Sequence, residues 1–298
     1  METIIGLGQA GCNIADCFAK HDEYDIYKID TGLEAYKRTP YGDFPQDGVY
    51  NMMPQSGPEE YEKYCPNFKN FFKDIKGEIL FIVGGSGDIS GTALRILEYL
   101  KGHEINILYI RPDVELLPEM KRKQEWVTFN ILQEYARSAV LKRIYIVENS
   151  LVEQHLGEVP LIGYHDRLNE MIVSTMHMIN VYNHIDSVTN TFSEPYKTAR
   201  ISTIGIFDIE NNESKEFFLL DRPREMRYYY TINKDKLKSD GALFKKIKQQ
   251  VKDKISDDLK VSYGIFATNY KRDFAYTVSY SASVQKGIPL EEFFLLDK

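Results

Sequence analysis

Uninterrupted hydrophobic runs alternate with longer amphipathic segments through the first half of the chain. Apolar runs without polar alternation are typical of parallel strands buried on both faces. The segments between them predict helices that cover both faces of a parallel sheet, in an α/β architecture. We predict strands at 2–7, 24–29, 79–83, 105–110 and 143–147, helices at 13–20, 91–101 and 118–141, a helix or helix pair at 59–76, and a loop over most of 39–58.

The pattern changes near residue 166, where Gly and Pro disappear from a long stretch with helical spacing of apolar residues. This stretch predicts one long helix over 166–184. We therefore expect a first domain over 1–165, a central connecting helix over 166–187 and a smaller C-terminal α/β domain with a short tail over 188–298. In the last domain we predict strands at 200–208, 217–220 and 227–232, a helix at 241–255, and strands at 261–267 and 274–281 joined by a turn.

Composition narrows the class of protein. Hydrophobic residues make up 43% of the 298 residues, which is ordinary for a globular chain, and no run of about 18 apolar residues predicts a membrane span. The net charge of −7 argues against direct nucleic-acid binding. Cys12, Cys17 and Cys65 have neither disulfide-framework nor zinc-site spacing. With a strand pattern starting at Glu2 in place of a signal peptide, we expect a cytoplasmic protein.

A first glycine-rich loop follows the first predicted strand. The segment Gly6-Leu7-Gly8-Gln9-Ala10-Gly11 has G-x-G-x-x-G spacing, which lets backbone N–H groups approach a phosphate at a helix N-terminus. The motif alone is weak, because a tight strand-to-helix turn uses the same glycines without a ligand. Asp30 stands close to the position of a ribose-binding acid, so a dinucleotide site competes as an interpretation.

A second glycine-rich loop follows the third predicted strand. The segment 84–91 packs four glycines and two serines into eight positions. A dinucleotide-binding half does not require this second cluster. Because parallel strands end at one edge of the sheet, two such loops there favour a mononucleotide whose phosphates lie between them.

These segments resemble the tubulin/FtsZ superfamily in order and spacing over nearly the whole chain. The segment 83–94, which contains the second loop, aligns without gaps with tubulin's G-G-G-T-G-S-G-M-G-T-L-L, and Gly8-Gln9-Ala10-Gly11 is similar to its G-Q-C-G. The other matching segments are Ser56-Gly57-Pro58-Glu59 on the γ-phosphate-side loop, Val147-Glu148-Asn149-Ser150 and Asn169-Glu170 on the base-contacting motifs, and 261–284 on the closing hairpin of FtsZ.

The resemblance implies a GTP site, with each residue also open to a simpler interpretation as a turn, cap or surface pair. The phosphates would lie against both glycine loops, the ribose against an acid–base pair one helical turn apart, and the base against two asparagines and a ring. The implied nucleotide-binding residues are Gly8, Gln9, Ala10, Gly11, Gly85, Ser86, Gly87, Glu119, Lys123, Asn149, His165 and Asn169.

Two departures from the family pattern affect the phosphate loop. Asp88 replaces a small residue, and a carboxylate near a triphosphate raises the electrostatic energy unless a cation or a basic group offsets it. Its side chain would point away, hold Mg²⁺ or cap the following helix. Ile89 replaces a glycine, which stiffens the loop.

A third departure affects the loop that, in the family, inserts acids into the neighbouring subunit's site for hydrolysis. Asn190 to Pro195 align with N-x-D-x-x-D, and both aspartate positions are lost. Glu194 is then the candidate catalytic acid, and Asp186 a poorer one. Hydrolysis and its absence both stay open.

The leading functional hypothesis is a compact phage- or plasmid-type relative that binds GTP and assembles with itself head to tail, with GTPase activity on polymerisation left open. It would act with an adaptor or cargo protein in a bacterial or phage-infected cytoplasm. The tail at 290–298 would be either a peptide that docks on the next subunit or a frayed terminus. A degenerate structural or regulatory protein without turnover is the second hypothesis. The third is a nicotinamide-dependent oxidoreductase using Gly6, Gly8, Gly11 and Asp30.

Overall fold

The computed structural model describes residues 1–33 and 48–286, which fall into two compact units. The first consists of the described residues of Met1–Ser150 together with Lys286, and the second of Leu151–Gln285. Each unit is described by itself. The domain boundaries drawn from the sequence at 165/166 and 187/188 stay predictions.

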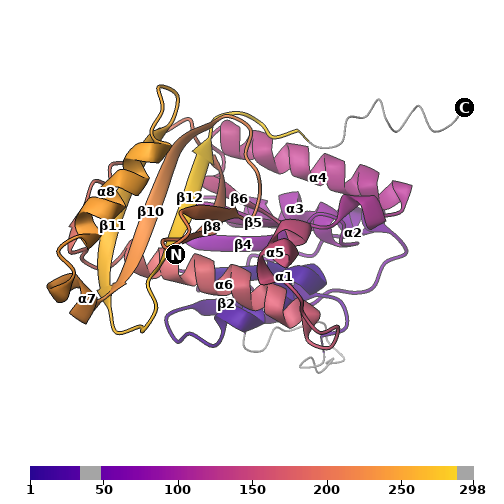
Figure 1. The fold of residues 1–298 in the computed structure, drawn as a ribbon. Helices are drawn as coiled ribbons and strands as arrows, with labels where there is room; N and C mark the ends of the chain where they lie inside the picture. Colours follow the sequence, from indigo (N-terminus) through magenta and orange to yellow (C-terminus); the bar gives the residue numbers. More distant parts are fainter. Residues whose placement is uncertain (34–47, 287–298) are drawn as a thin grey trace, which may run out of the picture. The chain divides into compact units, whose positions relative to one another are not determined.

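The first unit is built on a parallel sheet in the order β3-β2-β1-β4-β5-β6 (Figure 1). Every residue of β1 and β5 is buried, as the uninterrupted apolar runs predict. The strands are β1 (Thr3–Leu7), β2 (Asp25–Asp30), β3 (Val49–Asn51), β4 (Ile79–Gly84), β5 (Ile105–Arg111) and β6 (Arg143–Glu148).

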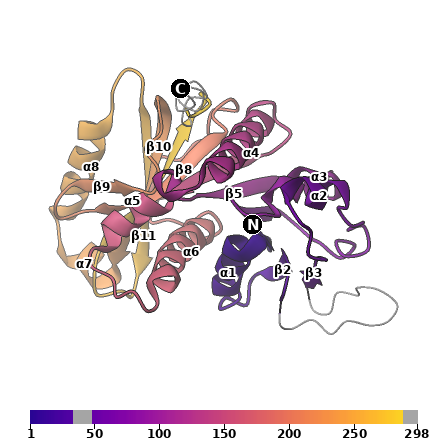
Figure 2. The ribbon, with the colours of Figure 1, turned by 90° about the vertical axis from the view of Figure 1, so that its right-hand side faces the viewer.

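Helices lie on both faces of this sheet. Helix α1 (Gly8–Phe18) packs on β1, β2 and β4, and α4 (Glu119–Arg137) lies on the opposite face (Figure 2). The remaining helical segments of the unit connect the strands: α2 (Pro58–Lys63), η1 (Ser90–Thr92), α3 (Ala93–Tyr99), η2 (Val114–Leu116) and the start of α5 (Asn149–Leu156). The predicted α/β architecture with a parallel sheet is confirmed.

The second unit begins with the rest of α5 and the long helix α6 (Tyr164–Tyr182), which lies two residues earlier than predicted at each end. Its sheet has the order β8-β12-β10-β11-β7, with β9 on β8. Strands β10 and β11 are parallel and the other pairs are antiparallel. The elements are β7 (Thr189–Asn190), β8 (Ile201–Asp208), β9 (Glu213–Glu216), β10 (Pro223–Asn233), α7 (Lys234–Ser239), α8 (Leu243–Lys254), β11 (Lys260–Thr268) and β12 (Phe274–Ser281).

Consecutive tyrosines on β10 pack on opposite faces of that sheet, because side chains alternate along a strand. Tyr228 and Tyr230 join the core that α8 covers. Tyr229 instead donates a hydrogen bond to Asn183 Oδ1 at 2.9 Å, just after the end of α6. One short run of sequence therefore anchors both helical layers of the unit.

Several local predictions are wrong. Helix α1 begins at Gly8, inside the first glycine loop, rather than at 13, and in 59–76 the structure has one short helix, α2. The segment 217–220 is not a strand. Phe217 and Phe218 are buried, but the strand that pairs with β8 is β9, which ends at Glu216. Residues 39–47 lie outside the described part of the chain.

The predicted closing hairpin is also wrong. Strands β11 and β12 are consecutive in sequence and joined by a short turn, yet β10 lies between them and pairs with both. The turn at 269–273 therefore crosses over β10 instead of closing a hairpin.

Candidate functional site

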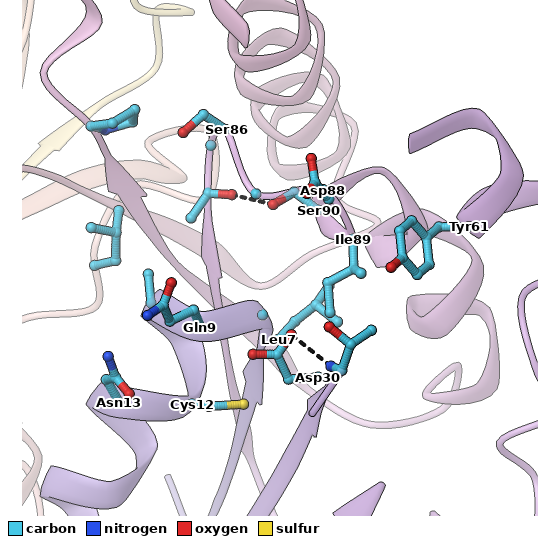
Figure 3. A pocket seen from close by; sticks show the side chains of 18 of the residues that line it. Leu7, Gln9, Cys12, Asn13, Asp30, Tyr61, Ser86, Asp88, Ile89 and Ser90 are labelled. Atoms are coloured by element: carbon cyan, nitrogen blue, oxygen red, sulfur yellow. Dashed lines mark hydrogen bonds between the residues drawn. The ribbon is translucent and has the colours of Figure 1, made fainter. Parts of the chain in front are cut away.

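A pocket of about 670 Å³ opens in the first unit beyond the carboxyl ends of β1, β2 and β4 (Figure 3). Parallel strands bring these ends to one edge of the sheet, where open α/β sheets bind ligands. We call it the glycine-loop pocket. Its lining comes mainly from the first half of α1, the segment after β2 and the loop after β4, with single residues of α2, α4 and α5. It includes Gly8, Gln9, Ala10, Cys12, Asp16, Asp30, Gly85, Ser86, Gly87, Asp88, Ile89, Lys121 and Asn149.

The first glycine loop is also the first turn of α1. Gly8 has φ +72°, a conformation that favours glycine, and a Cβ at Gly6 would lie 2.4 Å from the Gly11 carbonyl oxygen. No side chain caps this helix. Because the first four N–H groups of a helix have no partner within it, this turn presents donors and a positive field to the pocket.

The second glycine loop is fixed tightly against β5. Gly85 N donates to the Ile110 carbonyl at 3.0 Å. Ser90 Oγ donates to the Gly84 carbonyl at 2.5 Å, and Gln124 Nε2 on α4 donates to the Gly87 carbonyl at 2.6 Å. These bonds hold the loop in a defined conformation facing α1, with Ser86 and Gln9 on the two sides of the pocket (Figure 3).

A buried charged network lies behind the second glycine loop. Glu125 Oε1 accepts from Tyr109 Oη at 3.1 Å and from Arg111 Nε at 3.3 Å, and Arg111 Nη1 reaches Glu148 Oε2 at 3.4 Å. Burial raises the pKa of the Glu125 carboxyl, with Arg111 opposing the shift. The network supports the second glycine loop, and its member Glu148 directly precedes Asn149 in the chain.

Asp88 pairs with the ammonium group of Lys121 on α4. Neither η1 nor α3 has a side-chain cap, so the capping role considered for Asp88 is not observed in this part of the chain. Ile89 is buried, and its φ of −91° is ordinary, so the loop accepts a branched residue there.

Two further acids and a thiol line the same pocket. Asp16 pairs with Lys28 at 2.7 Å. Asp30 accepts from Thr31 N at 2.8 Å, and partial burial raises the pKa of its carboxyl. Burial raises the pKa of the Cys12 thiol to about 12, so this group is a protonated lining residue rather than a nucleophile.

The structure brings seven of the predicted binding residues to the glycine-loop pocket. Gly11 is not part of the lining; a Cβ there would lie 2.6 Å from the Ile82 carbonyl oxygen, which explains the glycine by packing. Glu119 and Lys123 form an exposed ion pair on α4 and are not part of the lining either. The seven are Gly8, Gln9, Ala10, Gly85, Ser86, Gly87 and Asn149.

His165 and Asn169 lie on the first turns of α6 in the second unit. The His165 ring lies 5.2 Å from the Tyr164 ring, centroid to centroid. Their predicted contacts with a base stay predictions.

Sequence reasoning missed Lys121 and Gln124. They are three positions apart and so share a face of α4, whereas Lys123 is two positions from Lys121 and points to the other side. The register of α4 decides which basic residue reaches the second glycine loop. The i, i+3 spacing of a cation and an amide was the available signal.

The loop that carries Glu194 is held within the second unit. Glu194 is exposed, and the residue before it is clamped: Arg227 donates to the Ser193 carbonyl and Lys260 to the Ser193 hydroxyl. The Phe192 ring packs 5.0 Å from the Tyr229 ring, centroid to centroid. The candidate acid therefore projects from an anchored segment.

A buried carboxylate holds the two clamping cations. Glu225 is fully buried, with Arg227 Nε at 3.4 Å and Lys260 Nζ at 3.8 Å. A buried charge is tolerated when it is paired, so this cluster balances the desolvation of Glu225. Glu225 and Arg227 are two positions apart on β10, and the pairing of β10 with β11 brings Lys260 beside them.

Comparison with known proteins gives a fold but no close relative by sequence. No family model matches the chain, and no curated protein matches it. A TubZ in a GTPγS-form protofilament from Bacillus thuringiensis serovar israelensis has a TM-score of 0.68 at 15% identity, with 93% of this chain and 86% of that chain covered.

Two other solved structures agree. An FtsZ dimer from M. jannaschii has a TM-score of 0.66 at 14% identity, covering 94% of this chain and 88% of that chain. A GTPγS-bound protofilament of CetZ2 from Haloferax volcanii has a TM-score of 0.66 at 15% identity, covering 99% of this chain and 97% of that chain. The predicted resemblance is confirmed: this chain has the fold of the tubulin/FtsZ superfamily.

Proposed function

We propose that the glycine-loop pocket binds GTP through its phosphates. The observation that carries the proposal is the pair of rigid glycine loops facing each other at one sheet edge. The close approach of Gly85 to Tyr109 and the positive φ of Gly8 give both loops a reason to be glycine. A cavity of about 670 Å³ lies within the usual range of about 300–1,000 Å³ for small-molecule sites.

Recognition of guanine is assigned to amide side chains. Asn149 lines the pocket at the end of β6 and offers both a donor and an acceptor. The proposal adds Asn169 and His165 at the base and Glu119 with Lys123 at the ribose. The GTPγS and GDP forms of TubZ and the GTPγS form of CetZ2 support guanine as the base.

The proposal extends to head-to-tail self-assembly into filaments. The TubZ and CetZ2 neighbours are protofilaments or helical filaments, and a heterologous contact that does not close generates a fibre. Glu194 is proposed as the acid that orients or deprotonates the attacking water in the neighbouring subunit's site. The exposed carboxylate on its clamped loop supports this role.

Further parts of the proposal concern Mg²⁺ and cellular context. Mg²⁺ prefers carboxylate and phosphate oxygens, and Asp30 supplies a pocket-lining carboxylate. The protein is proposed to act in the cytoplasm of a bacterium or phage-infected cell with an adaptor or cargo protein. No helix among the described residues is long and apolar enough to cross a membrane.

Equilibrium titration with GTP, GDP, ATP and NADH tests the nucleotide assignment. We expect saturable binding of GTP and GDP, and weaker binding of ATP. Tight NADH binding would favour the oxidoreductase hypothesis, for which Asp30 lines the same pocket. Absence of binding for all four would favour the degenerate protein without nucleotide.

A further inference from the structure

A single ion pair connects α4 to the second glycine loop at the mouth of the glycine-loop pocket. Lys121 and Asp88 both line the pocket, and their side chains pair with each other. Among the described lining residues, Lys121 is the one Lys or Arg, against the acids Asp16, Asp30 and Asp88. The one cationic side chain among the described lining residues is therefore paired with a carboxylate.

The geometry leaves Lys121 free to change partner. Its side chain is 31% exposed and that of Asp88 is 66% exposed, so solvent reaches both. The Lys121 ammonium group also contacts Gln124 Oε1, at 3.4 Å. An exposed ion pair of this kind contributes little to stability. The loop itself is held by other bonds, from Ser90 to Gly84 and from Gln124 to Gly87. Loss of the pair would therefore leave the loop in place.

A polyphosphate in this pocket would compete with Asp88 for the ammonium group. Phosphate oxygens carry more charge than one carboxylate and form strong charge-assisted hydrogen bonds with Lys. Asp88 would then repel the same phosphates, because its carboxylate and the bound phosphate carry like charges close together. The two members of the pair thus act on a phosphate ligand in opposite directions.

Resting on the GTP site proposed above, we infer that Lys121 is a phosphate-specificity residue that transfers from Asp88 to the terminal phosphates of the nucleotide. Asp88 opposes this transfer and lowers the affinity for the triphosphate. Lys121 thereby makes the affinity depend on the number of phosphates of the nucleotide. The glycine loops would bind the nucleotide whatever that number is.

The test is a set of titrations with a non-hydrolysable GTP analogue, GDP and guanosine, at protein concentrations too low for assembly. The variants are K121M and D88N, with K121R as the charge-preserving substitution. R137M is the matched control, because Arg137 is on the same helix and pairs with Glu134 outside the lining. Unfolding midpoints establish that each variant is folded, and K121Q replaces K121M if the latter is not.

We expect K121M to weaken binding of the GTP analogue by about tenfold or more and that of GDP by less, since a hydrogen bond to a charged group is lost. Guanosine binding should not change. D88N should strengthen binding of the GTP analogue by about threefold to tenfold, from the repulsion removed. K121R should retain affinity, and R137M should bind all three ligands like the wild type.

The inference requires K121M and D88N to change the affinity for the GTP analogue in opposite directions. If K121M and D88N both weaken binding, or neither changes it, the pair is only structural and the inference is overturned. If D88N weakens binding in Mg²⁺ but not in EDTA, Asp88 is a metal ligand and the inference is also overturned. A wild-type protein that binds none of the three ligands would instead contradict the proposed GTP site itself.

Discussion

A Cβ atom at Gly85 would lie 2.3 Å from the Tyr109 hydroxyl oxygen. That hydroxyl is itself fixed by a hydrogen bond to the buried Glu125 carboxylate. The backbone of the second glycine loop therefore packs directly against side chains of β5 and α4. This contact makes a small residue at position 85 a requirement of the loop's shape.

The first prediction concerns this contact. Gly85→Ala should displace the loop or Tyr109, lower the free energy of unfolding by about 1–3 kcal/mol as overpacking does, and abolish tight nucleotide binding. Gly91→Ala is the matched control, because the nearest atom to its Cβ lies 4.0 Å away. Denaturant unfolding and nucleotide titration measure both effects. Equal behaviour of the two variants would contradict the account of the loop.

The second prediction concerns the pH dependence of stability. Burial raises the pKa of Glu125, so the folded state holds this proton more tightly than the unfolded state. The free energy of unfolding should therefore fall as the pH rises from the ordinary carboxyl value through the raised one. Glu125→Gln cannot titrate and should remove this part of the slope. Unfolding curves of both proteins between about pH 4 and 8 measure it; parallel pH profiles would contradict the assignment.

The third prediction concerns the clamp on the Glu194 loop. Glu225→Gln leaves Arg227 and Lys260 without their buried counter-charge and should cost about 3 kcal/mol of stability. Hydrogen exchange should also rise in 191–196. Asp258→Asn is the control, because the Arg224–Asp258 pair next to this site is exposed and should change stability by less than about 1 kcal/mol. Unchanged exchange in 191–196 would show that Glu225 does not hold the loop.

The fourth prediction separates an enzyme from a degenerate homologue. Glu194→Gln should keep GTP binding and assembly and reduce phosphate release by about 100-fold, in the range of general acid–base contributions. Asp186→Asn, also exposed, should release phosphate at the wild-type rate. Phosphate release from assembled protein measures both. Wild-type release by the Glu194 variant would remove this residue from the mechanism, and no release by any variant would indicate a protein without turnover.

Much of the fold and part of the site could be predicted because their signals are local. The buried parallel strands show as apolar runs. Both loops show as glycine because backbone atoms at Gly6 and the Tyr109 side chain at Gly85 exclude a Cβ. Lys121 could not be chosen over Lys123 without the register of α4 against the loop. The Glu225 cluster joins residues near 193, 225 and 260, which only the sheet topology brings together. The order of β10, β11 and β12 escaped prediction for the same reason.

Sedimentation of the purified protein with GTP, with GDP and without nucleotide, with the pellets viewed by negative-stain electron microscopy, tests whether nucleotide drives self-assembly. We expect filaments with GTP and few or none in the other two conditions. Absence of filaments in every condition, together with no nucleotide bound to the purified protein, would contradict this expectation. Filaments in equal amount under all three conditions would contradict the nucleotide dependence and leave only self-assembly.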